Sequence, residues 1–261
     1  APVKAALPLG CVLTLPATGS ESNPAAVVSR GEAKLSFYNP LVLPRFAVLD
    51  PTTTYSLPPR QVGNGVVDAF VHILEQYLTF PVGGEVQDRL AEGLLQVLVD
   101  NGPRALTEPT NYQVRANLMW AASLALNGLI GRGVPQDWST HAIGHQLTAL
   151  HGLDHAQSLA VVLPSLLRAQ AAQKQEKLAQ FAERVWYSGR EDRALRIEEA
   201  IIRTEQFFQQ MGVGTRLADY GLTESCIPAI CSNLKRFGLT ALGEQQDIDP
   251  DKVARILSHA L

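Results

Sequence analysis

The sequence predicts a mostly α-helical protein whose helices are preceded by a short, strand-rich segment. Two observations carry this prediction. Short apolar runs bounded by proline fill the beginning of the chain, and the hydrophobic period becomes helical after Pro51. With 261 residues and 46% hydrophobic content, the chain has enough apolar material for one large or two modest folded units. We therefore expect a division into residues 1–50 and residues 51–261.

The first fifty residues contain the strand signals. The expected strands are residues 9–15, 25–30, 32–38 and 46–50, with a hairpin turn at Gly31. The first of these lies between Pro8 and Pro16 and is apolar enough to be buried. These strands are too few to form an independent domain. Their apolar sequences are typical of strands in a larger parallel sheet that is covered by helices.

Helical periodicity follows. Ser56 before Pro58 and Pro59 predicts a helix start, because a capping side chain then precedes proline in the first turn. That helix should run to about Phe80. The later helices are expected at 85–101, 112–130, 136–150, 154–173, 174–186, 194–211, 224–237 and 250–261.

Composition and charge exclude several classes of protein. The net charge is −3 and the charges are dispersed, so no basic surface for nucleic acid is expected. No apolar run approaches the roughly 20 residues of a membrane span, and the start of the chain does not resemble a secretory signal. Three cysteines without metal-site spacing indicate neither a disulfide framework nor a zinc ribbon. A cytoplasmic globular protein is the expectation.

An acid and a histidine stand out in the first long helix. Asp68 and His72 are four residues apart in the segment VVDAFVHIL, which is apolar on nearly all sides. A carboxylate there needs a partner, because an unpaired buried charge is very costly. Residues four apart share one helix face, so both side chains can hold one ion. Taken alone, an ordinary intrahelical pair explains them equally well.

More histidines follow in a second cluster. His141 and His145 repeat the spacing of four on another predicted helix, and His155 follows Asp154, the expected N-cap of the next. A helix–loop–helix can bring the first turns of these helices together, so His141 and His155 can face the earlier pair.

A single histidine is more often a satisfied core residue than a ligand. That explanation is preferred for His151, and His259 near the chain end is expected at the surface. For the others, one carboxylate with several neutral imidazoles suits Zn²⁺ or Fe²⁺ better than Ca²⁺ or Mg²⁺, which prefer oxygen ligands. The spacing thus predicts a transition-metal site and leaves its full ligand set open.

Longer stretches around these residues carry a more specific signal. They are LTLPATGSE (13–21), LPPRQ (57–61), NGVVDAFVH (64–72), GVPQDWSTHAIGH (133–145) and HGLDHA (151–156). Together they resemble the iron-containing (group III, metal-dependent) alcohol dehydrogenases, especially the NADPH-dependent aldehyde reductase and butanol dehydrogenase branch. The resemblance covers essentially the whole chain. It implies an all-helical, dehydroquinate synthase-like metal-binding domain, preceded by the last strands of an α/β nucleotide-binding domain.

Transferred residue by residue, the resemblance assigns a role to each candidate. It implies the metal ligands Asp68, His72, His141 and His155. It places His145 beside the metal in the substrate cleft, where we expect it to relay a proton. It implies the cofactor contacts Thr14, Thr18 and Lys34. Trp138 is a candidate for lining the cleft, whereas Trp120 and Trp186 are expected in the core.

One feature of the family has no counterpart in these residues. The family's cofactor domain carries a Gly-Gly-Gly-Ser loop, whose backbone amides approach the pyrophosphate. Gly83 and Gly84 lie between predicted helices and do not replace it. We therefore expect a truncated form of the enzyme with impaired cofactor binding.

The implied activity is reversible hydride transfer between NAD(P)H and an aldehyde or primary alcohol, in a homodimer that uses Fe²⁺ or Zn²⁺. NADP is favoured over NAD by the branch resemblance alone. A metal-binding helical module without redox activity and a metal-assisted hydrolase stay open as alternatives. Glycerol dehydrogenase and maleylacetate reductase are nearer alternatives within the superfamily.

Overall fold

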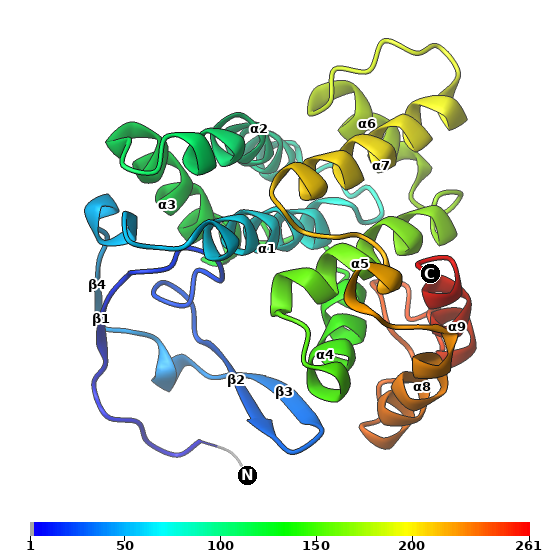
Figure 1. Cartoon of the computed structure of the whole chain (residues 1–261), viewed down its shortest axis with the longest axis horizontal. Helices are drawn as coiled ribbons and strands as arrows, with labels where there is room; N and C mark the ends of the chain where they lie inside the picture. The colour runs from blue at the N-terminus through cyan, green and yellow to red at the C-terminus, as the bar shows by residue number, and fades with distance from the viewer. Residues whose placement is uncertain (1–2) are drawn as a thin grey trace.

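The computed structural model in Figure 1 describes residues 3–261 and confirms the mostly helical class. The described residues form nine α-helices: α1 (Pro59–Tyr77), α2 (Glu85–Thr107), α3 (Tyr112–Leu126), α4 (Ser139–His151), α5 (His155–Ala169), α6 (Gln175–Arg184), α7 (Arg193–Gln210), α8 (Ile227–Arg236) and α9 (Pro250–Ser258). They also form four short strands: β1 (Gly10–Val12), β2 (Ala25–Arg30), β3 (Ala33–Tyr38) and β4 (Phe46–Val48). Every strand precedes every α-helix, while the division into two domains at residue 50 stays a prediction.

The strands form two separate pairs in the described part of the chain. β1 runs parallel to β4 with Cys11 opposite Ala47, and β2 runs antiparallel to β3, which confirms the hairpin. The expectation of a buried first strand is wrong for this structure. Val12 on β1 is 56% exposed and Phe46 on β4 is 63% exposed, because the described residues give this pair of strands no third strand.

Two helix ends close to proline residues differ from the sequence expectation. α1 starts at Pro59, and Pro58 is held extended before it without a side-chain cap, so Ser56 is not the cap. A residue that precedes proline is disfavoured in the helical region, which explains the extended Pro58. α2 continues through Pro103 to Thr107, beyond the expected end at 101. Burial of Ala105 in the core offsets the single backbone hydrogen bond that Pro103 removes.

Two apolar cores hold the helices together. The larger core joins α1, α2, α3, α5, α6 and α7, and the smaller joins α4, α5, α8 and α9. Trp186 lies in the larger core, as expected. Trp120 is 60% exposed, so the expectation of core packing is wrong for that residue. A surface position on α3 is compatible with the apolar sequence because a helix presents only one face to the core.

Helix α1 occupies the centre of the molecule, with α2 and α3 on one side and α4 and α5 on the other (Figure 1). It is buried continuously from Val62 to Tyr77, which explains why apolar residues predominate in its sequence. Polar side chains in this helix therefore face other protein groups. No helix in the described residues combines the length and the apolar character that crossing a membrane requires.

Candidate metal centre

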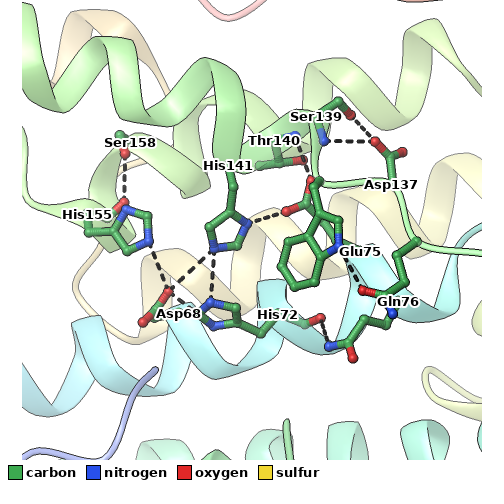
Figure 2. A network of polar contacts seen from close by, with 12 residues as sticks. Asp68, His72, Glu75, Gln76, Asp137, Ser139, Thr140, His141, His155 and Ser158 are labelled. Carbon is green, nitrogen blue, oxygen red and sulfur yellow. Dashed lines mark hydrogen bonds and ion pairs between the residues drawn. The ribbon is translucent and has the colours of Figure 1, made fainter. Parts of the chain in front are cut away.

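Three helices bring one carboxylate and three imidazoles to a common point. Asp68 and His72 come from α1, His141 from α4 and His155 from α5, and one ligand atom from each lies within 4.8 Å of all the others (Figure 2). The Nε2 atoms of His72 and His141 are 3.1 Å apart. Oδ1 of Asp68 lies 3.6 Å from His155 Nε2 and 4.0 Å from His141 Nε2. The structure thus joins the two histidine clusters that the sequence separates by about seventy residues.

The start of α5 is fixed to α1 by the residue next to His155. Asp154 is the N-cap residue of α5, and its backbone N–H donates to Oε1 of Gln157 in the first turn at 3.0 Å. Its Oδ2 also accepts hydrogen bonds from Arg60 Nε at 2.9 Å and Asn64 Nδ2 at 2.7 Å, both on α1. These contacts confirm the expected cap and place His155 over the face of α1 that carries Asp68.

Helices α4 and α5 approach each other closely at Gly144. A Cβ atom added there would lie 3.0 Å from Leu159 Cδ2 and from Ser158 Oγ, both on α5. Glycine therefore permits the short helix–helix distance that brings His141 and His155 together; their ring centroids are 5.1 Å apart.

The donor set fits a transition-metal cation. Asp68 Oδ1, His72 Nδ1 and His155 Nδ1 are buried and have no hydrogen-bond partner among residues 3–261. Buried polar atoms are normally hydrogen-bonded, so an orphaned carboxylate oxygen inside a ring of imidazoles indicates an additional partner. Ligands bound to one cation at about 2.1 Å lie roughly 3–4 Å from each other, close to the separations found here. Neutral nitrogen donors with one carboxylate favour Zn²⁺ or Fe²⁺.

Burial sets the protonation of these groups when no cation compensates for it. It raises the pKa of Asp68, while the charges of His72 and Lys34 oppose the rise. Burial lowers the pKa of His141 and of His155 well below the ordinary value, and neighbouring positive charges add to this effect. Both imidazoles are therefore neutral near pH 7, which is the form that binds a metal.

His145 lies next to the cluster and is not one of its four members. Its ring centroid is 5.2 Å from that of His155 and 6.2 Å from that of His141. Burial, followed by the charge of Lys34, lowers the pKa of His145 to about 4. A neutral imidazole at this position can accept or pass on a proton near the cluster.

The other histidines lie outside the cluster. His259 is exposed, as expected, and His151 at the end of α4 is half-buried. The expectation that His151 is a satisfied core residue is wrong in one respect, because its Nε2 is buried without a hydrogen-bond partner in the described residues.

The expected cofactor contacts lie on two segments beside α1 and α4. Thr14 and Thr18 are exposed on the segment that crosses α1 at Gly65, where an added Cβ would collide with the carbonyl oxygen of Pro16. Lys34 is half-buried on β3, and burial lowers its pKa against the opposing charge of Asp68. Lys34 is thus within electrostatic reach of the cluster. Its role and those of the threonines stay predictions.

A hydrogen-bonded contact fixes the hairpin that carries Lys34. Asn233 on α8 donates from Nδ2 to the carbonyl oxygen of Glu32 at 3.1 Å and to Oε1 of Gln146 on α4 at 2.8 Å. The hairpin turn is therefore tied to the helix that supplies His141.

Trp138 lies at the edge of the cluster. Its ring centroid is 5.3 Å from that of His141 and 6.1 Å from that of His72, and its side chain is half-buried. Its backbone is left-handed, with φ of 63°, directly before α4. This conformation is unfavourable for a bulky residue and is found most often at functional sites. The role of Trp138 in lining a substrate cleft stays a prediction.

Three further buried acids were not predicted from the sequence. Glu75 on α1 contacts His141, and Asp137 before α4 pairs with the buried Lys174 at 2.7 Å. Glu21 contacts Ser123 in another buried hydrogen bond. The reasoning that singled out Asp68, an acid in an apolar helix, applies equally to Glu75, three residues after His72.

Comparison with protein families agrees with this geometry. Residues 63–261 match the family described as Fe-containing alcohol dehydrogenase family, C-terminal, and residues 1–51 match iron-containing alcohol dehydrogenase. The chain belongs to the iron-containing alcohol dehydrogenase family, as the sequence resemblance predicted.

Individual relatives place it more closely. The chain is 59% identical to the NADPH-dependent aldehyde reductase YqhD of Escherichia coli, over 99% of this chain and 67% of that protein. It is 32% identical to the NADH-dependent butanol dehydrogenase B of Clostridium acetobutylicum, over 99% of this chain and 68% of that protein. A crystal structure of the E. coli protein superposes with a TM-score of 0.98 at 58% identity, covering 99% of this chain and 67% of that one. The chain therefore spans about two thirds of the length of these relatives.

Proposed function

We propose that this chain carries the metal-binding part of an NADPH-dependent aldehyde reductase, which interconverts aldehydes and primary alcohols by hydride transfer. The observation that carries the proposal is the convergence of Asp68, His72, His141 and His155, with a carboxylate oxygen at the centre that has no hydrogen-bond partner within residues 3–261. The 59% identity to an aldehyde reductase that uses NADPH supports the choice of substrate and cofactor. Membership of the family and the chemistry of the donor set support Fe²⁺ or Zn²⁺ as the metal.

The reaction places specific demands on these residues. Hydride addition to the carbonyl carbon leaves an electron pair on the carbonyl oxygen, and a bound divalent cation supplies a Lewis acid for that charge. In the proposed site, Asp68, His72, His141 and His155 would hold the cation. Three of these ligands are neutral and only one is an anion, so they would leave a bound divalent cation with a net positive charge toward developing negative charge on the substrate.

A proton must then reach the alkoxide oxygen. His145 is neutral, buried and adjacent to two of the proposed ligands, which supports it as the group that passes this proton on. Trp138 lies edge to face beside the rings of His72 and His141 and would limit the entry of water there. Thr14, Thr18 and Lys34 are proposed to contact the cofactor.

The proposal also includes the homodimer and the cytoplasmic location implied by the family resemblance. Light scattering on purified protein measures the oligomeric state. A monomer over the working concentration range would contradict the proposed homodimer.

Replacing His145 by alanine should lower kcat for aldehyde reduction by about 10²- to 10⁴-fold, the usual contribution of a positioned acid–base group. Metal content should not change, because His145 is outside the four-membered cluster. The measurement combines elemental analysis with the pH profile of kcat. His151→Ala, on the same helix, serves as the matched control. An unchanged kcat and pH profile in His145→Ala would remove His145 from the proton path.

The function itself is tested by metal-dependent oxidation of NADPH in the presence of aldehydes. The assay is run on the chain and on the longest natural reading frame that contains it, with Fe²⁺ and with Zn²⁺. Oxidation of NADPH that is lost with a chelator and restored by either metal is the expected result. Metal-replete protein from the longest reading frame that neither quenches NADPH fluorescence nor oxidises NADPH would favour a metal-binding module without redox activity.

A further inference from the structure

Glu75 is a buried acid that lies beside the metal cluster without belonging to it. It is on α1, three residues after His72, and only 3% of its surface is exposed. The four groups whose ligand atoms converge do not include it. A carboxylate in this position needs partners, because leaving it unpaired in the interior would be very costly.

Both carboxylate oxygens of Glu75 contact the first turn of α4. Oε2 contacts Nδ1 of His141, and Oε1 accepts a hydrogen bond from the backbone N–H of Thr140 at 2.6 Å (Figure 2). The backbone carbonyl of Glu75 accepts a further hydrogen bond from the N–H of Asp137 at 2.8 Å. One residue of α1 therefore holds the segment that carries His141 at three points.

The contact with Nδ1 decides which nitrogen of His141 is free. A neutral imidazole carries one proton, and a carboxylate at Nδ1 favours the tautomer with the proton on that nitrogen. The lone pair of Nε2 is then available, and Nε2 is the atom 3.1 Å from His72 Nε2 at the centre of the cluster. The other tautomer would place a hydrogen where the cation binds.

The neighbouring acid, Asp137, has partners of its own. Its Oδ1 accepts from the N–H of Ser139 at 2.9 Å, and its Oδ2 pairs with Lys174 Nζ at 2.7 Å. Lys174 is also bound by Glu244 at 2.7 Å and by the carbonyl oxygen of Leu78 at 2.7 Å. These contacts already satisfy the ammonium group of Lys174. The side chain of Glu75 therefore pairs with His141 and Thr140.

We propose that Glu75 is the positioning residue for His141: its carboxylate fixes the tautomer and the ring orientation that present Nε2 to the metal. This inference rests on the proposed metal site and deepens it. The arrangement follows the general rule that a metal-binding histidine donates its second N–H to a carboxylate or carbonyl group. The structure also gives Glu75 a backbone-capping role at Thr140, so the test must separate positioning from stability.

The test is Glu75→Gln, which keeps the size of the side chain and removes its charge. Binding of Zn²⁺ is measured by competition with a chelator of known affinity, on metal-stripped protein. We expect the affinity to fall by about 10- to 100-fold, the usual effect of losing such a partner. The matched control is Glu92→Gln, a buried carboxylate on α2 that pairs with Tyr77 and Arg184. The control should lose thermal stability and keep the wild-type metal affinity.

A second measurement reports directly on His141. Long-range ¹H–¹⁵N NMR of the histidine rings identifies the nitrogen that carries the proton, and His141→Ala assigns the signal. Metal-stripped wild type should show the proton on Nδ1, and Glu75→Asp should retain it because a carboxylate is still present. If Glu75→Gln does not fold, this pair of spectra still decides the question.

The outcomes separate the two proposals. Wild-type affinity for Zn²⁺ in folded Glu75→Gln, or a proton on Nε2 of His141 in the stripped wild type, would overturn the role of Glu75 and leave the metal site intact. Wild-type protein that binds no Zn²⁺ would overturn the site and this inference with it.

Discussion

Replacing Asp68 by alanine should remove the bound metal and abolish aldehyde reduction. Asp68 supplies the only carboxylate among the four converging groups, and its Oδ1 is buried with no hydrogen-bond partner in residues 3–261. Without it the cluster retains three neutral imidazoles and no charge to balance a divalent cation. The loss of affinity should exceed the roughly 10- to 100-fold effect of losing an outer partner. Elemental analysis of purified protein and chelator competition measure it.

A matched control for this variant is Asp100→Ala, which removes an exposed acid from helix α2. It should keep both metal and turnover. Circular dichroism of each variant checks that the helices form. Full metal stoichiometry in folded Asp68→Ala would defeat the assignment of this residue.

Replacing Phe70 by alanine should lower the free energy of unfolding by about 3–5 kcal/mol, the usual cost of removing a buried phenylalanine ring. Phe70 is fully buried on α1, two residues from Asp68. Its ring packs against those of Phe181, Trp186, Phe207 and Phe208, at centroid distances of 5.2 to 6.4 Å. The cavity would therefore open in the aromatic centre of the larger core. Denaturant unfolding of metal-stripped protein separates this effect from metal binding.

Trp120→Ala is the control for the size of the side chain. Trp120 is 60% exposed on α3, so its removal should change the free energy of unfolding by less than about 1 kcal/mol. Equal destabilisation by the two substitutions would contradict the description of the core around Phe70.

The sequence was most informative where the chemistry of the side chains and the helical periodicity indicate the same site. Asp68 and His72 could be paired because residues four apart lie on the same face of a helix. A carboxylate in an apolar helix also needs a partner. The structure brings His141 and His155 to that pair, as the spacing argument allowed. The histidines were thus predictable as a group from local periodicity together with a family resemblance.

Other features depend on contacts that periodicity cannot supply. Trp120 lies in a helix of apolar sequence, yet which face of that helix meets the core is decided by its neighbours. The strand that contains Val12 has the texture of a buried strand and is exposed in the described structure. The helix expected at 85–101 continues through Pro103 to Thr107, because residues beyond the proline pack in the core.

Glu75 illustrates a different limit. Its partner His141 is 66 residues away, so its role depends on the packing of α4 against α1 and not on any local pattern. The burial argument could have marked Glu75 as an acid that needs a partner, but it could not have named the atom that Glu75 contacts.

The central claim is that one cation is shared by four side chains from three helices. A crystal of metal-loaded protein, measured on both sides of the absorption edge of the metal, tests it directly. We expect one anomalous peak bonded to Asp68 Oδ1 and to a ring nitrogen of each of His72, His141 and His155. A peak elsewhere in the molecule, or none at these side chains in protein that carries stoichiometric metal, would contradict the account.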